Sequence, residues 1–364
     1  MERRLWRRFD YILLLVTLAL IGLGLMMIAS ATRGVPGEDL VRRQAIFAAI
    51  GLVVMFAVAA IDYRVFGGHF GLAIYLILLA GLIAVILYGR VLGGSRGWFA
   101  LGPFYIQPAE VGKVLVVLVM ARYLSRYETR LRQLPYLLAA ISLLIPPVVL
   151  IYLQPDLGGA VIVLMLGLTL IWLGGMRWRH LITLLIIGAV LAPTIWASLS
   201  PYMRTRILIF LNPESNPDAS YNIRQALISI GAGGLIGQGL GHGSQSQLHF
   251  LQVRHTDFIF SVLAEELGFI GATSFLLLIG VMLFRLLRIA DLARDAFGRL
   301  IACGVAFIIF SQTLVNVGMN LQMLPATGIT LPFVSYGGSS LITLMLGLGL
   351  AQSVSMRHKK LEFR

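Results

Sequence analysis

The chain has 364 residues, of which 58% are hydrophobic and only 12% are charged. A soluble domain usually carries about 25% charged residues, so this composition excludes a water-soluble globular protein and indicates an integral membrane protein. The formal net charge of +13 comes mainly from basic residues in short loops between apolar segments. This pattern indicates membrane orientation and contact with membrane lipids, with no nucleic acid partner.

Ten apolar segments are long enough to be membrane spans, since a helix needs about 20 apolar residues to cross the hydrocarbon layer. Only Gln154 and Pro155 separate the fifth segment from the sixth, so nine spans with one kinked helix is the alternative. The sequence predicts an all-α integral membrane protein of about ten transmembrane helices, with residues 1–364 forming a single domain. The predicted spans are 10–30, 43–61, 69–88, 107–124, 136–153, 156–174, 180–198, 258–284, 299–323 and 332–355.

The orientation of the bundle follows from its charge distribution. Most of the 29 Lys and Arg residues fall on one side when the N-terminus is cytoplasmic and ten spans alternate. Because cytoplasmic loops carry the excess of Lys and Arg, both the N- and C-termini are predicted to be cytoplasmic. With nine spans, this bias would break down after the fifth.

Two long segments then fall on the outer side, at 89–106 and 199–257. The second is a large extracytoplasmic loop between the seventh and eighth spans, and loops of this length are usually functional. Within it, Tyr221 to Ile230 predicts a short amphipathic helix. The glycine-rich stretch 231–243 allows the backbone to approach a ligand closely.

Ionisable residues within spans are energetically expensive and usually functional. Glu110 and Lys113 lie three residues apart after Pro108, so they share a helix face and predict a partly buried ion pair. This pair is either structural or a charged wall that contacts a polar substrate. Asp156 opens the sixth span, where an acidic residue interacts well with the helix dipole, and this capping role alone can explain it.

The eighth span has three carboxylates at its outer half. Thr256 or Asp257 is predicted to cap the helix at the membrane boundary. Glu265 and Glu266 lie about two turns deeper and are expected to form hydrogen bonds within the bundle. The last span opens with Pro-Phe-Val-Ser-Tyr-Gly-Gly-Ser-Ser at 332–340, and such small polar residues at membrane depth usually line a cavity.

These segments together resemble one family over essentially the whole chain. The chain is similar to the SEDS proteins (shape, elongation, division and sporulation), and to their elongation branch in particular. The matching motifs are Gln107–Glu110 with Lys113, Gln154–Gly158, Tyr221–Gln225, Ile230–Gly234, Gln245–Leu251, His255–Phe260, Glu265–Gly271 and Leu331–Ser340.

The resemblance implies a peptidoglycan glycosyltransferase of the bacterial cytoplasmic membrane. Its substrate would be lipid II, a disaccharide-pentapeptide on undecaprenyl pyrophosphate, which it would polymerise on the outer face during cell elongation. Its implied partners are a class B penicillin-binding protein, which acts as the transpeptidase, and other elongation-complex proteins. The alternatives are the division-specific branch of the family, a lipid II flippase and a non-catalytic scaffold for a partner synthase.

The chemistry requires one general base, because the pyrophosphate leaving group needs neutralisation of its charge and no acid. Asp257 falls on the catalytic aspartate of the family and is the hypothesised base. The start of a helix would lower its pKa, which weakens a base.

The remaining candidates are assigned to binding the substrate or supporting the cavity. A divalent cation, Mg or Mn, could share the pyrophosphate with Asp257 or Glu110 as oxygen ligands, although no ligand spacing identifies a metal site. The expected substrate-binding residues are Trp98, Gln107, Glu110, Lys113, Arg204, Arg206, Arg224, Gln225, Arg254, His255, Ser335 and Ser339, and the expected cavity or structural residues are Asp156, Glu265 and Glu266.

Overall fold

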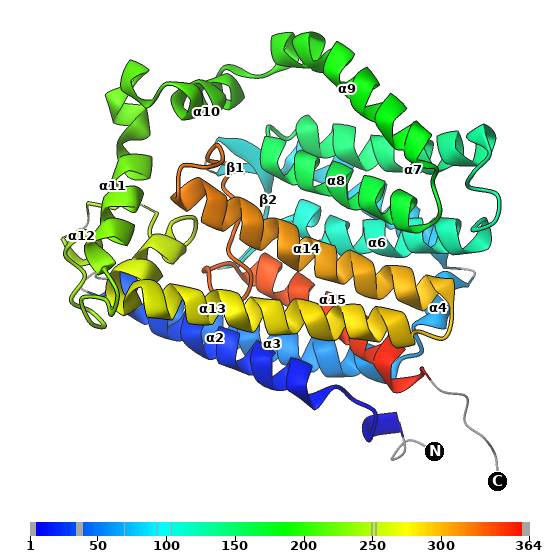
Figure 1. Cartoon of the computed structure of the whole chain (residues 1–364), viewed down its shortest axis with the longest axis horizontal. Coiled ribbons are helices and arrows are strands. Elements are labelled where there is room, and N and C mark those ends of the chain that lie inside the picture. The colour runs from blue at the N-terminus through cyan, green and yellow to red at the C-terminus, as the bar shows by residue number, and fades with distance from the viewer. Residues whose placement is uncertain are drawn as a thin grey trace.

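The computed structural model describes residues 5–33, 39–68, 70–92, 94–102, 104–248, 250–251 and 253–358. Long helices run side by side to form a bundle, with helices α9 to α11 along one edge (Figure 1). The bundle helices are α2 (Tyr11–Ala31), α3 (Leu40–Ala60), α5 (Gly71–Tyr88), α6 (Pro108–Arg126), α7 (Leu134–Tyr152), α8 (Leu157–Leu173), α9 (Trp178–Ser198), α13 (Ile259–Leu292), α14 (Ala296–Asn320) and α15 (Gly338–Met356).

Each predicted span overlaps one of these helices. Eight of the helices in the described part of the chain are long and apolar enough to cross a membrane. The other two are α8, which is apolar but has 17 residues, and α6, which has 19 residues but carries four charged side chains. The fold is therefore an α-helical multi-pass membrane protein with eight to ten candidate spans.

The disputed fifth and sixth segments are separate helices. Helix α7 ends at Tyr152 and α8 begins at Leu157 after a turn in which Pro155 has a φ of 30°. The two helices then pack against each other through Leu144, whose side chain fills the space beside Gly167. The alternative of one long kinked helix is therefore wrong, and the two expected spans are separate helices.

The start of α2 and the end of α15 lie at the same end of the bundle (Figure 1). The backbone N–H of Asp10 donates to Gln352 at 2.9 Å, and the Gln352 amide donates back to the Asp10 carbonyl at 2.9 Å. The Asp10 carboxylate also pairs with Arg285 at 2.7 Å. An even number of spans requires both termini to lie at the same end of the bundle, as they do here. That this end faces the cytoplasm stays a prediction.

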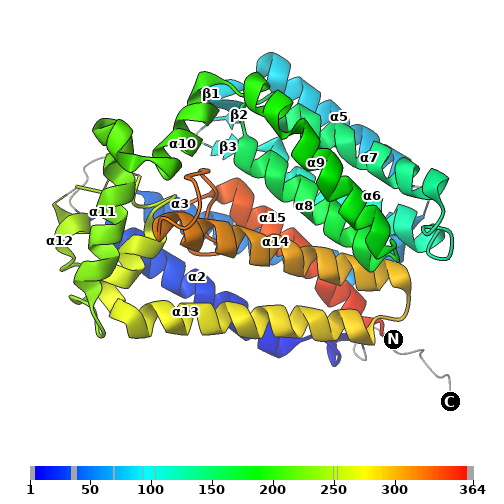
Figure 2. The ribbon, with the colours of Figure 1, turned by 45° about the horizontal axis from the view of Figure 1, so that its top comes forward.

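The segment 199–257 is largely helical. It contains α10 (Pro201–Leu211), the 3-10 helix η1 (Pro213–Ser215), α11 (Pro217–Gly233) and α12 (Ser244–Gln247). The short helix expected at 221–230 is therefore present but longer at both ends. Figure 2 shows α10 and α11 bridging from the end of α9 to the start of α13.

The glycine-rich stretch after α11 packs on the backbone of α13, which corrects the expectation that it approaches a ligand. Helix α13 is broken at Gly268, which has a φ of 68°. The break frees the carbonyls of Glu265 and Glu266, which accept from the N–H groups of Gln238 and Gly239 at 3.0 Å each. The glycine-rich segment and α13 lie so close that a Cβ at Gly237 would be 2.2 Å from the Glu266 carbonyl oxygen. Glycine is needed here because only a residue without a side chain lets the two backbone segments approach closely enough to form hydrogen bonds with each other within the membrane.

Three short strands depart from the predicted all-α structure. They are β1 (Arg90–Leu92), β2 (Ser95–Leu101) and β3 (Phe104–Ile106), which form an antiparallel sheet in that order. Arg90 pairs with Trp98, and Phe99 pairs with Ile106. The turns between strands contain Gly94 and Gly102, whose φ values of 82° and 61° suit glycine. This sheet forms the α5–α6 connection and places Trp98 in the lining of the cavity described below. The remaining short helix, α4 (Arg64–Gly67), lies at the opposite end.

Candidate active site

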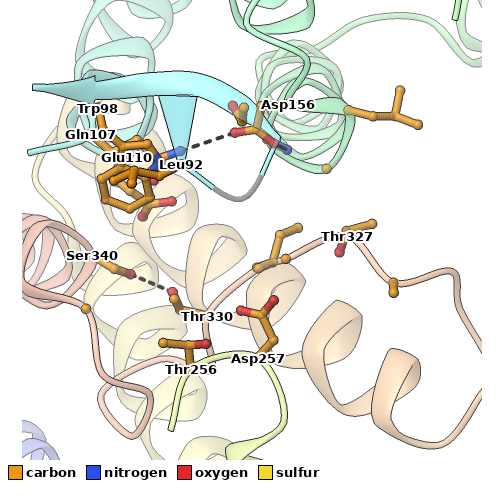
Figure 3. A pocket seen from close by; sticks show the side chains of 18 of the residues that line it. Leu92, Trp98, Gln107, Glu110, Asp156, Thr256, Asp257, Thr327, Thr330 and Ser340 are labelled. Carbon is orange, nitrogen blue, oxygen red and sulfur yellow. Dashed lines mark hydrogen bonds between the residues drawn. The ribbon is translucent and has the colours of Figure 1, made fainter. Parts of the chain in front are cut away.

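A cavity of about 720 Å³ lies at the end of the bundle opposite Asp10 and Gln352. Six separate parts of the chain meet around it: α3 through Phe47, the strands with the start of α6, the α7–α8 turn, α10, the segment before α13, and the α14–α15 connection. Figure 3 shows Asp257 on one wall and Asp156, Gln107, Glu110 and Trp98 on the opposite side. The expected residues that line it are Trp98, Gln107, Glu110, Lys113, Asp156, Arg206, Asp257 and Ser339.

Asp257 is held through its backbone, because α14 presents two buried asparagines to it. The side-chain amides of Asn316 and Asn320 both donate to the Asp257 carbonyl oxygen at 3.0 Å. Asn316 also donates to the Ile329 carbonyl at 2.7 Å, so one side chain ties Asp257 to the α14–α15 connection. Both asparagines are fully buried. The sequence reasoning missed them, although polar amides four residues apart inside an apolar span were a visible signal.

The expectation that Thr256 or Asp257 caps α13 is wrong. Helix α13 begins at Ile259, its N-cap residue is Phe258, and no side chain caps it. The Asp257 carboxylate faces the cavity instead, since it lines the same space as Arg206. Burial raises the pKa of Asp257, while the Arg206 charge and a hydrogen bond from Thr256 act in the opposite direction. A carboxylate with a raised pKa is a better proton acceptor near neutral pH than an exposed one.

The opposite wall contains a second carboxylate that is tied to its own helix. Asp156 caps α8, and its carboxylate accepts from the Gly159 N–H at 2.7 Å and from the Gln107 amide at 3.4 Å. Burial raises the pKa of Asp156, and the nearby Lys113 charge opposes this. Its two oxygens are already engaged, so Asp156 is a less available base than Asp257.

The ion pair expected from the spacing of Glu110 and Lys113 is present. Their charged atoms are 2.5 Å apart, and the Lys113 side chain is only 2% exposed. Gln312 of α14 donates to the other Glu110 oxygen at 3.4 Å. Because both residues also line the cavity, the pair forms a charged wall as well as a structural contact.

Arg206 lies on α10 and lines the cavity together with Asp257. A Cβ built on Gly328 would lie 3.4 Å from Nη1 of Arg206 and 3.6 Å from Oδ2 of Asp257, so both charged groups face the same glycine. The Arg206 guanidinium also lies over the Tyr202 ring, 4.5 Å from its centroid, and donates to the Tyr202 hydroxyl. Tyr202 was not among the expected residues.

The connection from α14 to α15 supplies the lower rim of the cavity. The Ser335 hydroxyl donates to the Thr256 carbonyl at 2.5 Å, and the Tyr336 N–H donates to the His255 carbonyl at 2.9 Å. Ser335 and His255 thus fasten this connection to the Asp257 segment, behind the cavity lining. Ser340 also lines the cavity, as expected of the small polar residues at 332–340. Thr327 and Thr330 line it too and were missed, since only the fold brings this connection beside Asp257.

Several expected residues lie outside the cavity. Arg204 donates to the Trp196 and Ala197 carbonyls, and Arg224 donates to the Pro213 carbonyl at 3.1 Å. Arg254 is buried and donates to the Ala31 carbonyl. Gln225 stands on α11, away from the lining residues. The three arginines satisfy backbone carbonyls within the protein, and none of the four residues lines the cavity, so we do not assign them to the substrate.

Glu265 and Glu266 hold the connections at this end of the bundle together. Glu265 accepts from the N–H groups of Gln245 and Ser246 at 2.7 and 3.2 Å. Glu266 accepts from the Ser30 hydroxyl at 2.5 Å. Both are fully buried away from the cavity, and both form the hydrogen bonds within the bundle that adjacent carboxylates in a span require.

The cavity does not assemble a protein cage for a divalent cation. Among the described residues, no three His, Cys, Asp or Glu side chains gather as metal ligands. Glu110 is paired with Lys113, and the Asp156 oxygens accept from protein donors. We therefore assign no ligand set to Mg or Mn.

The sequence and the fold match those of known proteins. A family model described as a cell cycle protein, covering FtsW, RodA and SpoVE, matches residues 11–360. The peptidoglycan glycosyltransferase MrdB of Escherichia coli strain K12 is 40% identical over 356 residues, which span 97% of this chain and 95% of that protein.

Solved structures give the same result. A chain from a structure described as a peptidoglycan synthase complex that coordinates polymerization and crosslinking has a TM-score of 0.82 and 35% identity, with coverage of 95% of this chain and 97% of that chain. The crystal structure of the rod shape determining protein RodA of Thermus thermophilus has a TM-score of 0.72 and 32% identity, with coverage of 95% and 96%. The chain therefore belongs to the SEDS family of multi-pass membrane proteins. Within that family it is a peptidoglycan glycosyltransferase similar to MrdB and RodA.

Proposed function

We propose that this chain polymerises lipid II into glycan strands at the described cavity, with Asp257 as the general base. The observation that carries the proposal is the position of Asp257: it faces a cavity that also contains the guanidinium of Arg206 and the ammonium of Lys113. A glycosyl transfer from a lipid pyrophosphate needs a proton acceptor and cationic groups in one enclosed space. MrdB, a relative of this chain, is named as a peptidoglycan glycosyltransferase.

The reaction is a single inverting displacement. The 4-hydroxyl oxygen of one sugar forms a bond to the anomeric carbon of another, and the bond from that carbon to the pyrophosphate oxygen breaks. Asp257 accepts the hydroxyl proton, and the pyrophosphate leaves with the bonding electrons. One carboxylate is sufficient, unlike in glycosidases that need an acid and a base, because pyrophosphate leaves without protonation.

Arg206 and Lys113 are assigned to the pyrophosphate. A guanidinium matches two phosphate oxygens through paired N–H donors. Tyr202 supports the Arg206 side chain from one face, so that its planar group is oriented before the substrate arrives. Trp98, on the strand at the mouth, offers an aromatic face to the sugar or the lipid.

The pH dependence should report the raised pKa of Asp257. The base acts only when deprotonated, so kcat/KM for polymerisation should rise with pH as Asp257 loses its proton. Because burial raises this pKa, the acid limb should lie above the ordinary aspartate value of about 3.9. A pH–rate profile with purified protein and lipid II measures it, and an acid limb at or below pH 4 would contradict the assignment.

Replacing Asn316 should displace Asp257 without touching its carboxylate. Asn316→Ala leaves the buried carbonyls of Asp257 and Ile329 without this donor, which costs about 1–3 kcal/mol. We expect polymerisation to fall about tenfold or more, mainly in kcat. Thr313→Ala on the same helix is the control, since Thr313 bonds only to its own helix at the Ile309 carbonyl. Equal activity of the two variants would argue against a positioning role.

The elongation role and the partners extend this proposal. The similarity to RodA supports a role in cell elongation over the division-specific alternative. The similar chain in a peptidoglycan synthase complex supports a class B penicillin-binding protein as the crosslinking partner. Elongation-complex proteins would then act with both in the bacterial cytoplasmic membrane.

Purified protein reconstituted with labelled lipid II tests the function directly, with and without the partner synthase. Formation of glycan chains supports the proposal. Movement of lipid II across the vesicle membrane without chains would support the flippase alternative. If neither occurs with the partner present, the chain acts as a scaffold and the proposal fails.

A further inference from the structure

A second cavity, of about 540 Å³, opens at the other end of α8 from the active-site cavity. It is lined by Arg132, Arg177 and Arg179 together with Gly175, Met176 and Trp178. Arg132 comes from the α6–α7 turn, whereas Arg177 is the N-cap residue of helix α9 and Arg179 lies in its first turn, so the cavity joins two parts of the chain that are far apart in the sequence. We propose that this cavity binds the headgroup of an acidic phospholipid, preferentially one that carries two phosphates.

The floor of the cavity is packed. Leu131, at the tip of the α6–α7 turn, is completely buried and lies 3.1 Å from the position of a Cβ at Gly174. Met176 in the α8–α9 turn is also buried. Gly175 has a φ of 110°, which lets that turn lie against the Glu128 carbonyl of the other turn. The two turns therefore form one body that holds arginines from both at fixed separation.

The three arginines are available to a ligand. Elsewhere at this end, Arg64, Arg285, Arg299 and Arg357 each pair with a carboxylate of the protein. Within the described residues, Arg132, Arg177 and Arg179 make no ion pair, and all three are exposed. Three guanidinium groups around one cavity complement two phosphate groups, each of which accepts paired N–H donors.

The surroundings of the cavity favour a lipid over a soluble anion. Trp178 is 63% exposed beside the arginines, where an indole at the membrane interface suits both headgroup and chain. Helix α9 continues from it with no buried residue, and Ile182, Leu185 and Ile186 are exposed along its length. Trp172 and Leu173 are exposed on the adjoining end of α8. Acyl chains attached to a headgroup in the cavity would run along these apolar surfaces, so one lipid can contact both the arginines and the helix faces, which a soluble polyanion cannot.

A charge-matched comparison separates this site from general attraction to a basic surface. The test variant is Arg132→Gln/Arg177→Gln/Arg179→Gln, and the control is Arg7→Gln/Arg288→Gln/Arg294→Gln. The control arginines are exposed at the same end of the bundle and line neither cavity. Both variants lose three charges, so any change in bilayer attraction or orientation is shared.

The measurement is titration of the purified full chain in detergent with cardiolipin, followed by native mass spectrometry of the lipid adducts. Phosphatidylcholine serves as the neutral comparison. We expect wild type to bind cardiolipin at least tenfold more tightly than phosphatidylcholine. The test variant should lose on the order of 100-fold in cardiolipin affinity, and the control less than threefold.

Single variants keep the test decisive if the triple variant does not fold. Arg132→Gln and Arg179→Gln alter different turns, and each alone should weaken cardiolipin binding several-fold, because both contact one headgroup. Equal losses in the test and control variants would overturn the site, as would wild-type protein that shows no preference for cardiolipin. The outcome is independent of polymerisation, since none of these residues lines the active-site cavity.

Discussion

Asp257→Asn is expected to lower the rate of lipid II polymerisation by about 10²- to 10⁴-fold, the usual contribution of a general base. The amide keeps the size and shape of the side chain but cannot accept the hydroxyl proton. The backbone contacts that hold this position, from Asn316 and Asn320, involve the carbonyl oxygen and are unchanged. Binding of lipid II should therefore persist while the chemical step fails. Single-turnover measurements with labelled lipid II separate the two.

Asp291→Asn is the matched control for this variant. Asp291 is exposed on the last turn of α13, at the end of the bundle away from the cavity, so the same change there should leave polymerisation unaltered. If Asp257→Asn polymerised lipid II at the rate of Asp291→Asn, another group would have to accept the proton. Asp156 would be the next candidate, because its carboxylate also lines the cavity.

Lys113→Met is expected to destabilise the protein by about 3 kcal/mol and to abolish polymerisation. It leaves the Glu110 carboxylate, which is 14% exposed, without its cation in the wall of the cavity. Breaking a buried ion pair by removing one partner typically costs about 3–5 kcal/mol, and the contact of Glu110 with the cavity favours the lower end of this range. Chemical unfolding in detergent measures the stability, and the lipid II assay measures the activity.

The double variant Glu110→Gln/Lys113→Met distinguishes the two roles of Lys113. Removal of both charges should restore most of the stability, because no unpaired charge is left behind. Polymerisation should stay low if Lys113 also neutralises the pyrophosphate. Recovery of both stability and activity would show that the pair serves the fold alone. If Lys113→Met alone were as stable as wild type, the Glu110 carboxylate would not need Lys113 as a cationic partner.

The sequence by itself determined the membrane class, the position of the spans and the family. Long apolar runs and sparse charge permit few other structures, since a helix satisfies its own backbone in lipid. Motifs such as His255–Phe260 and Leu331–Ser340 then identified the SEDS family. The local ion pair of Glu110 and Lys113 also followed from the sequence, because residues three apart on a helix are neighbours.

Only the tertiary structure decided which polar residues share the cavity. Six distant segments meet there, and their contacts depend on helix packing that no local pattern encodes. Arg204 and Arg206 are two residues apart, yet Arg206 lines the cavity while Arg204 binds carbonyls near the end of α9. The glycines of 231–243 likewise look suited to a ligand, but Gly233 and Gly237 lie against the backbone of α13. Periodicity reports which face of an element is apolar, whereas the partner of each polar group is set by long-range contacts.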